Sequence, residues 1–102
     1  MTTVRLEPEA DEELGAAARW YEAQREGLGH EFIDAADEAI SRIASPAHGS
    51  SPVPGVELPV RRIFMKRFPY AVVFMATTNE IVIVAFAHVR RRPGYWSSRL
   101  QG

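Results

Sequence analysis

The first half of the chain places its apolar residues at the spacing of a helix. Pro8 is tolerated in a first helical turn, and the acidic residues that follow it favour a helix N-terminus. The pattern therefore predicts a helix from about residue 8 to residue 25. Its apolar stripe consists of Leu14, Ala17, Ala18 and Tyr21.

Gly27 and Gly29 interrupt this pattern, which then resumes and predicts a second helix over residues 29–44. The short connection indicates that the two helices form an antiparallel hairpin with facing apolar stripes. Residues 45–55 contain three prolines and two glycines, which predicts a surface loop. The stripe of the second helix consists of Phe32, Ala35, Ala36, Ala39, Ile40 and Ile43.

Short runs of apolar and β-branched residues predict four strands. They lie at residues 3–6, 59–66, 69–76 and 80–88. The turn at residues 77–79 ends in an asparagine, which tolerates a positive φ, and predicts a hairpin between the last two strands. The order β-α-α-β-β-β predicts a single α+β domain over residues 1–102, with the helical hairpin on one face of a small, mostly antiparallel sheet.

The last two predicted strands are apolar on both faces, and two helices can cover only one face of a sheet. Residues 81–87 are apolar throughout. A contiguous exposed apolar patch usually marks an interaction site, so we expect a protein partner or a second copy of the chain on the other face. The alternative cover is the chain's own tail, through Tyr95, Trp96 and Leu100. The alternating sets of residues 69–76 are Tyr70, Val72 and Phe74 on one face and Ala71, Val73 and Met75 on the other.

Composition narrows the class of protein. With 102 residues there is room for one domain, and 46% hydrophobic residues are too many for a disordered chain. The absence of cysteine excludes disulfides and thiolate metal sites and fits a reducing cytoplasm. The N-terminus lacks the pattern of a signal peptide, and the apolar runs are shorter than the roughly 20 residues of a membrane span. We expect a cytoplasmic protein with no membrane contact, metal or cofactor.

The net charge of −1 hides a strong asymmetry. Residues 1–59 carry 4 Lys and Arg against 12 Asp and Glu, whereas residues 60–102 carry 8 against the single acidic residue Glu80. This basic second half favours a positive face for an anion, either nucleic acid or an acidic protein segment. The alternative is that the acidic side chains only solvate the helices and the basic side chains only solvate the sheet.

Three sequence segments, in this order, resemble a known family. They are ARWYEAQREGLGHEF, VRRIFMKRFPYAVVF and AHVRRRPGYWSSR. Together with the element order they resemble the RelE/ParE superfamily of type II toxin–antitoxin toxins, from about Val4 to Arg99, and are most similar to its ParE-like, plasmid-stabilisation branch. The resemblance implies a small toxin that a cognate antitoxin holds inactive by wrapping its C-terminal segment around the sheet and helices. Operator DNA would be contacted only through the antitoxin.

Members of this superfamily act on different targets, and each target requires different functional residues in the toxin. RelE-like members cut mRNA in the ribosomal A site, whereas ParE-like members inhibit DNA gyrase. RNA cleavage requires proton-transfer groups and cations for the phosphorane. For a RelE-like enzyme we expect His88 as acid or base, Arg62 as a phosphate clamp, and Lys66 or Glu57 as the second proton-transfer group. Residues expected to bind the target or a phosphate are Arg61, Arg90, Arg92, Tyr95 and Trp96.

Several of these residues also have a purely structural interpretation. His88 can cap its strand and pack under the tail, and we expect His30 and His48 to be solvated. Tyr95 and Trp96 follow a Pro-Gly break, so we expect them to close a core rather than to stack on bases.

The three consecutive arginines cannot all act together if they belong to a strand. Because neighbours on a strand alternate faces, we expect Arg90 and Arg92 to share a side. Arg91 would then pair with a carboxylate of the helical layer.

The acidic helical layer would repel RNA, since phosphate neutralisation supplies most of the affinity of RNA-binding proteins. We therefore expect a ParE-like gyrase inhibitor. The alternatives are a RelE-like mRNA interferase and a non-toxic member that acts only in an antitoxin and repressor complex.

Overall fold

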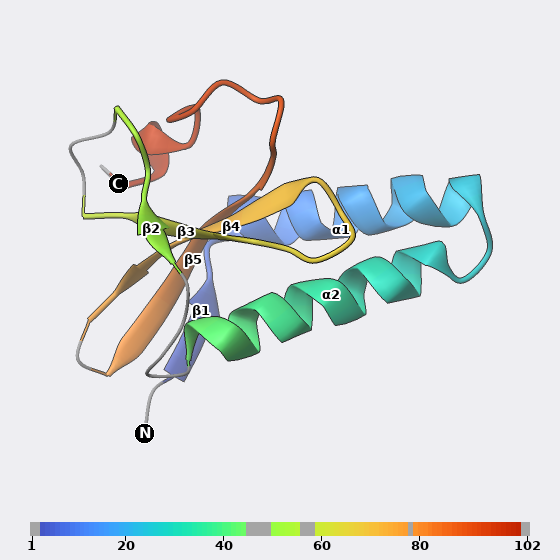
Figure 1. Ribbon diagram of the computed structural model, residues 1–102, viewed down its shortest axis with the longest axis horizontal. Helices are drawn as coiled ribbons and strands as arrows, with labels where there is room; N and C mark the ends of the chain where they lie inside the picture. Colours follow the sequence, from blue (N-terminus) through green and yellow to red (C-terminus); the bar gives the residue numbers. More distant parts are fainter. Residues whose placement is uncertain (1–2, 45–49, 56–58, 78, 101–102) are drawn as a thin grey trace.

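The computed structural model describes residues 3–44, 50–55, 59–77 and 79–100. Two helices form one layer and a five-stranded sheet forms the other (Figure 1). This arrangement confirms the predicted α+β class. Neither helix in the described ranges is both long and apolar enough to cross a membrane.

The helical hairpin consists of α1, Pro8–Gln24, and α2, Leu28–Ile43, each within one residue of the predicted bounds. Gly27 has φ 89°, a left-handed conformation that glycine adopts without steric cost and that lets the chain reverse direction. The backbone N–H groups of Gly27 and Gly29 donate hydrogen bonds of 2.9 and 3.0 Å to the Glu22 carboxylate. These bonds lower the pKa of Glu22 and satisfy donors at the start of α2.

The sheet has the order β1-β5-β4-β3-β2. Its first strand, β1, pairs in parallel with β5, and every other neighbouring pair is antiparallel. The predicted hairpin between the last two strands is confirmed, with a register shift between Val73 and Phe74 of β4 that leaves Val84 of β5 as the extra residue. The strands are β1 (Thr3–Leu6), β2 (Ser51–Pro52), β3 (Arg61–Phe64), β4 (Tyr70–Ala76) and β5 (Glu80–His88).

One strand lies where the sequence predicted only a loop. Ser51 and Pro52 of β2 pair with Arg62 and Arg61 of β3. A two-residue strand that contains proline at the edge of a sheet leaves no alternating pattern in the sequence. The remainder of the predicted loop includes residues 45–49, which lie outside the described residues.

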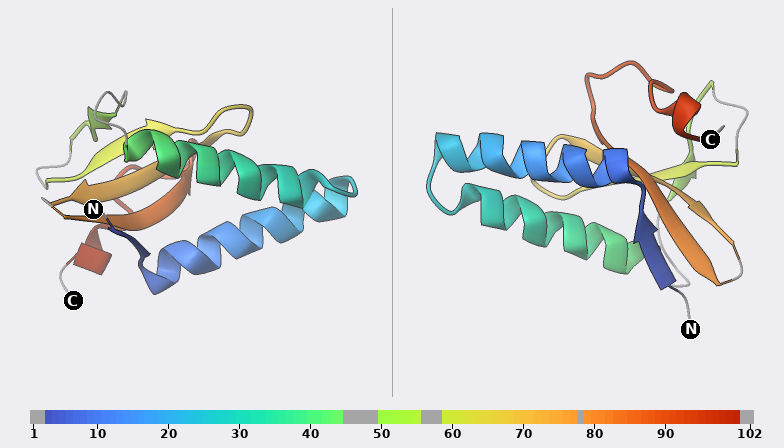
Figure 2. Two further views of the ribbon diagram at one scale, coloured as in Figure 1. Left: turned by 90° about the horizontal axis from the view of Figure 1, so that it is seen from below. Right: turned by 180° about the vertical axis from the view of Figure 1, so that it is seen from behind.

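The sheet has a core on each face. Toward the helices, Phe32 of α2 packs with Val72 and Phe74 of β4, all fully buried. On the other face, Val73 and Val84 pack with Trp96 of the C-terminal segment. Figure 2 shows the helices on one side of the sheet and the C-terminal segment on the other. The predicted alternation in β4 is thus confirmed, and the chain's own tail covers part of the second face.

Candidate functional site

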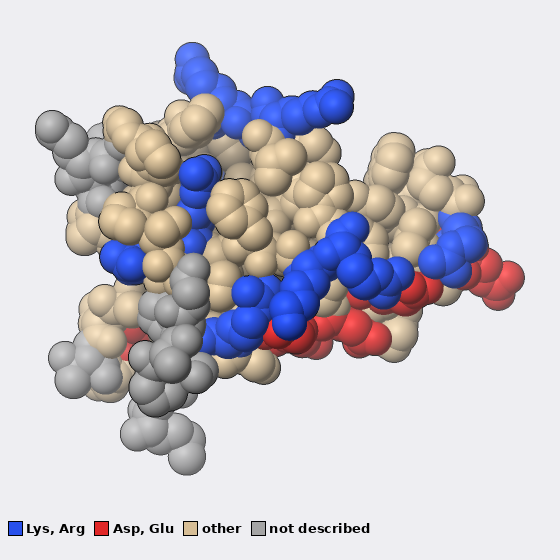
Figure 3. Space-filling view, in the orientation of Figure 1, with Lys and Arg blue, Asp and Glu red and all other residues tan. Residues whose placement is uncertain are grey.

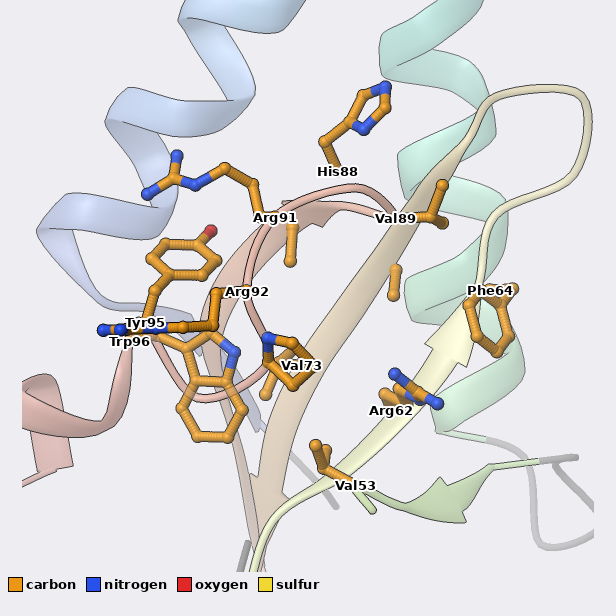
Figure 4. Close-up of a pocket in the computed structure, with 13 residues that line it drawn as sticks. Val53, Arg62, Phe64, Val73, His88, Val89, Arg91, Arg92, Tyr95 and Trp96 are labelled. Carbon is orange, nitrogen blue, oxygen red and sulfur yellow. The ribbon is translucent and has the colours of Figure 1, made fainter. Parts of the chain in front are cut away.

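A pocket of about 220 Å³ opens where β5 ends, on the sheet face opposite the helices. Its walls come from β3, β4, the end of β5 and the segment that follows β5 (Figure 4). We call it the β5 pocket. It is lined by Val53, Arg62, Phe64, Ala71, Val73, Ala87, His88, Val89, Arg91, Arg92, Pro93, Tyr95 and Trp96.

Arg62 reaches this pocket because side chains on β3 alternate faces. Ile63 is buried against the helices, whereas Arg62 and Phe64 line the β5 pocket. The Arg62 guanidinium carbon lies 5.0 Å from the centre of the Phe64 ring, a cation–π contact. Its Nε is buried and, among the described residues, has no hydrogen-bond partner. The Arg62 Nε–H is therefore a donor for which the described part of the free chain offers no acceptor.

Arg61 lies outside the β5 pocket. Its guanidinium donates hydrogen bonds of 2.9 Å to the Ser50 hydroxyl and 2.8 Å to the Ser50 carbonyl. These bonds connect β3 to the segment that leads into β2. Both arginines were candidate site residues, but only Arg62 lines the β5 pocket.

The expectation that Arg90, Arg91 and Arg92 alternate along a strand is wrong. Strand β5 ends at His88, and the three arginines lie in a turn in which the Arg91 N–H donates 2.9 Å to the His88 carbonyl. Arg91 and Arg92 both line the β5 pocket. Arg91 does not pair with a carboxylate of the helical layer; its guanidinium lies over the Tyr95 ring at 3.9 Å.

His88 packs at the end of its strand. Its Nδ1 accepts a hydrogen bond of 3.0 Å from the backbone N–H of Arg90. The ring meets Tyr70 edge to face at a centroid distance of 5.2 Å. This geometry is that of a residue that caps a strand, and it brings His88 into the same pocket as Arg62.

Tyr95 and Trp96 close the core, as expected. Trp96 is only 2% exposed. The Tyr95 hydroxyl donates a hydrogen bond of 2.6 Å to the Glu13 carboxylate of α1. Burial, together with this bond to Glu13, raises the pKa of the Tyr95 hydroxyl.

Glu13 also holds Arg99, so that one carboxylate fastens the tail to α1. The two Nη groups of Arg99 donate 2.9 and 3.1 Å to Glu13, and one of them donates 3.0 Å to the Val84 carbonyl. The backbone N–H of Phe86 donates 3.1 Å to the same carboxylate. Arg99 is thus the tail arginine that pairs with the helical layer. No local sequence pattern marks this pairing of residues 86 positions apart.

Four cations beside the helices are paired with carboxylates, whereas Arg19 of α1 has no ion pair among the described residues. Arg25 and Arg67 share Glu31, and this contact with two arginines lowers the pKa of Glu31. Arg42 and Lys66 share Glu38, with Lys66 Nζ 3.7 Å from the carboxylate. Lys66 therefore lies on the helical side and does not line the β5 pocket.

Cations beside the β5 pocket are not paired. Within the described part of the chain, Arg62, Arg90, Arg91 and Arg92 form no ion pair. Figure 3 shows carboxylates next to the basic side chains along the helical layer, whereas the basic side chains over the segment after β5 have none beside them. Unbalanced positive charge is thus concentrated at this pocket.

Of the remaining histidine and acid candidates, the structure describes only His30, which does not line the β5 pocket. His30 is exposed and lies 3.9 Å from Asp34, one helical turn away. His48 and Glu57 lie outside the described residues. In the described ranges, no three His, Asp or Glu side chains gather as metal ligands would.

A second cavity, of about 380 Å³, adjoins the β5 pocket on the helical side of the sheet. We call it the α1 groove. Trp20 lines it and is 59% exposed, which is unusual for so large an apolar side chain. Trp20 was not among the candidates from the sequence, because a single aromatic residue within a helix forms no pattern of its own. Residues that line both cavities are His88, Arg91 and Tyr95.

Comparisons with known proteins point to one family. The family described as the ParE toxin of the type II toxin–antitoxin system, parDE, matches residues 4–93. A solved chain from the chromosomal ParDE TA system of P. aeruginosa has the same fold, with a TM-score of 0.72 and 18% sequence identity. The match covers 86% of this chain and 96% of that one. No curated protein sequence matches significantly. The family match extends over most of the chain, which therefore belongs to the ParE toxin family of type II toxin–antitoxin systems.

Proposed function

We propose that this chain is a toxin that a cognate antitoxin neutralises and that acts by binding and inhibiting DNA gyrase. The observation that carries the proposal is the joint occurrence of a ParE family match and a surface suited to a large partner. That surface combines unpaired arginines with exposed apolar side chains on the two adjoining cavities.

An antitoxin as partner is supported by the family and by the exposed apolar residues. Trp20 is 59% exposed, Phe64 48% and Val89 52%, and the last two line the β5 pocket. The tail covers only part of the second sheet face, so a bound segment of another chain would remove these side chains from water. The structure of the P. aeruginosa ParDE system supports the same kind of pairing.

The site gives little support to RNA cleavage. The second proton-transfer candidate, Lys66, is held by Glu38 on the helical side. His88 uses Nδ1 for a backbone hydrogen bond. The Tyr95 hydroxyl donates its hydrogen bond to Glu13, and its raised pKa keeps it protonated, so it cannot serve as a base at neutral pH. The comparisons name ParE and not RelE.

The experiment for this proposal has two steps. Expression of the chain alone in a bacterial host should stop growth with an SOS response, and co-expression of the antitoxin should restore growth. The purified chain should then inhibit supercoiling by purified bacterial DNA gyrase. Unchanged gyrase activity at saturating toxin would reject gyrase as the target, and unimpaired growth with tight antitoxin binding would indicate a non-toxic member.

A further inference from the structure

Arg62 is the most unusual cation of the described chain. It is partly buried, its Nε is shielded from water, and no acceptor among the described residues takes that hydrogen bond. A buried donor without an acceptor is destabilising, and native structures contain few of them. Its contact with the Phe64 ring offsets only part of the lost hydration. The free chain thus has a polar group that a bound acceptor would satisfy.

We propose that the β5 pocket receives one carboxylate side chain of the antitoxin, which Arg62 and Arg92 bind from opposite sides. Figure 4 shows Arg62 on the β3 side of the pocket and Arg92 on the side of the C-terminal segment. Arg92 is exposed and free to turn toward a ligand. The inference rests on the proposed function, because the antitoxin is its occupant.

Charge is the first reason for an acidic occupant. Most other cations of the described chain are paired, with Glu31 and Glu38 each binding two of them and Glu13 binding Arg99. Among the described residues, no acidic side chain lines the β5 pocket. A guanidinium group binds a carboxylate through two parallel hydrogen bonds, which are among the strongest in proteins. The missing counter-charge is therefore expected from the partner.

The apolar rim is the reason for a protein segment rather than a nucleic acid. Phe64 and Val89 border the pocket and are about half exposed, and Val73, Ala87 and Pro93 complete an apolar wall. A phosphate backbone offers nothing apolar to such a wall, whereas a peptide can place aliphatic side chains on either side of its carboxylate. The 12 acidic residues in the first 59 would also repel a polyanion.

The test measures the dissociation constant between the purified chain and its purified antitoxin. Arg62→Met keeps an unbranched apolar stem and removes the guanidinium with its charge, and we expect it to weaken binding about tenfold or more. Arg92→Met changes an exposed residue, so we expect this variant to fold normally and to lose less affinity for the antitoxin than Arg62→Met. Arg19→Met removes the same charge from the exposed outer face of α1 and should leave the dissociation constant unchanged.

A double-mutant cycle identifies the carboxylate. Each Asp and Glu of the antitoxin is changed to its amide, alone and together with Arg62→Met. We expect one acidic residue whose loss costs clearly less once Arg62 is gone, because only its contact with Arg92 is then left to lose. If the antitoxin binds Arg62→Met as tightly as the wild type, or if no acid couples to Arg62, the inference is overturned while the proposed function stands. If Arg62→Met instead weakens binding of a DNA or RNA duplex and not of the antitoxin, the occupant is a nucleic acid. If the antitoxin does not bind the wild-type chain, both proposals fail.

Discussion

The hydroxyl of Tyr95 lies 2.6 Å from the carboxylate of Glu13, and this contact joins the C-terminal segment to the first helix. Arg99 and the backbone N–H of Phe86 bind the same carboxylate. Both charged side chains are mostly buried, with 15% of Arg99 and 20% of Glu13 exposed. One acidic residue of α1 therefore fixes the tail that forms a wall of the β5 pocket.

We predict that Glu13→Gln lowers the free energy of unfolding by about 2–3 kcal/mol. The amide cannot accept all the hydrogen bonds that the carboxylate accepts, and it leaves Arg99 partly buried without a counter-charge. Urea denaturation at neutral pH measures the change. The control is the exposed neighbour Glu12→Gln, expected within about 0.5 kcal/mol of the wild type. Equal losses for the two variants would show that the contact with the tail contributes nothing.

The raised pKa of Tyr95 predicts how stability depends on alkaline pH. Because the folded pKa lies above the ordinary value of 10.0, the neutral hydroxyl is favoured in the folded state. The stabilisation is complete below about pH 10 and is lost as the pH rises through the folded pKa. Urea denaturation between pH 8 and 11, about the usual tyrosine range, should show the decline.

Tyr95→Phe should reduce that alkaline decline without abolishing it. Burial also raises the pKa values of Tyr21 and Tyr70, which therefore contribute a decline of their own. At neutral pH the variant should lose about 1–2 kcal/mol, since the Glu13 carboxylate loses a donor. An unchanged alkaline slope in Tyr95→Phe would contradict the assignment.

The fold was largely accessible to sequence reasoning because most of it is periodic. Helical spacing of apolar residues located α1 and α2 to within one residue, and alternation in β4 identified which side chains face the helices. The strand β2 was not predicted, because its two residues, Ser51 and Pro52, are too few to form an alternating pattern.

The candidate site was predicted less well, because it depends on where a strand stops. Val89 is apolar and could have continued β5, but its N–H bonds the Pro69 carbonyl and the chain then turns. That turn brings Arg91 and Arg92 to one pocket, although alternation predicted different faces. The pairing of Glu13 with Arg99 was also hidden, since only the tertiary fold brings the two residues together.

Gly29 is expected to tolerate no side chain. A Cβ at this position would lie 2.5 Å from the Ala18 carbonyl oxygen, a backbone atom that cannot move without shifting α1. Gly29→Ala should therefore destabilise the chain by about 1–3 kcal/mol, as overpacking does. Gly15→Ala is the matched control, because its closest neighbour is the mobile end of Arg19 at 3.1 Å. That change should be neutral or stabilising by up to about 1 kcal/mol, and thermal unfolding compares the two.

Trp20 should be important for binding and unimportant for folding. It is 59% exposed beside the α1 groove, so Trp20→Ala removes little buried area from the free chain. Exposed tryptophans that partners bury are frequent hot spots, and we expect antitoxin affinity to fall about tenfold or more. Trp20→Phe, which keeps an aromatic ring, should retain most of the affinity. An unchanged dissociation constant for Trp20→Ala would place the antitoxin elsewhere.

Arg62 offers a case in which binding and stability should change in opposite directions. In the free chain its Nε is buried and has no acceptor among the described residues, which lowers the free energy of unfolding. Arg62→Met replaces the guanidinium by an apolar group that can still contact Phe64, and should leave the free energy of unfolding unchanged or raise it by up to about 1 kcal/mol. Arg61→Met, on the same strand, should instead destabilise slightly, since it breaks two hydrogen bonds to Ser50. Urea denaturation of both variants without antitoxin distinguishes these effects. A clear loss of stability in Arg62→Met would mean that Arg62 stabilises the free fold. The buried Nε could then not be taken as a donor that is kept for a bound ligand.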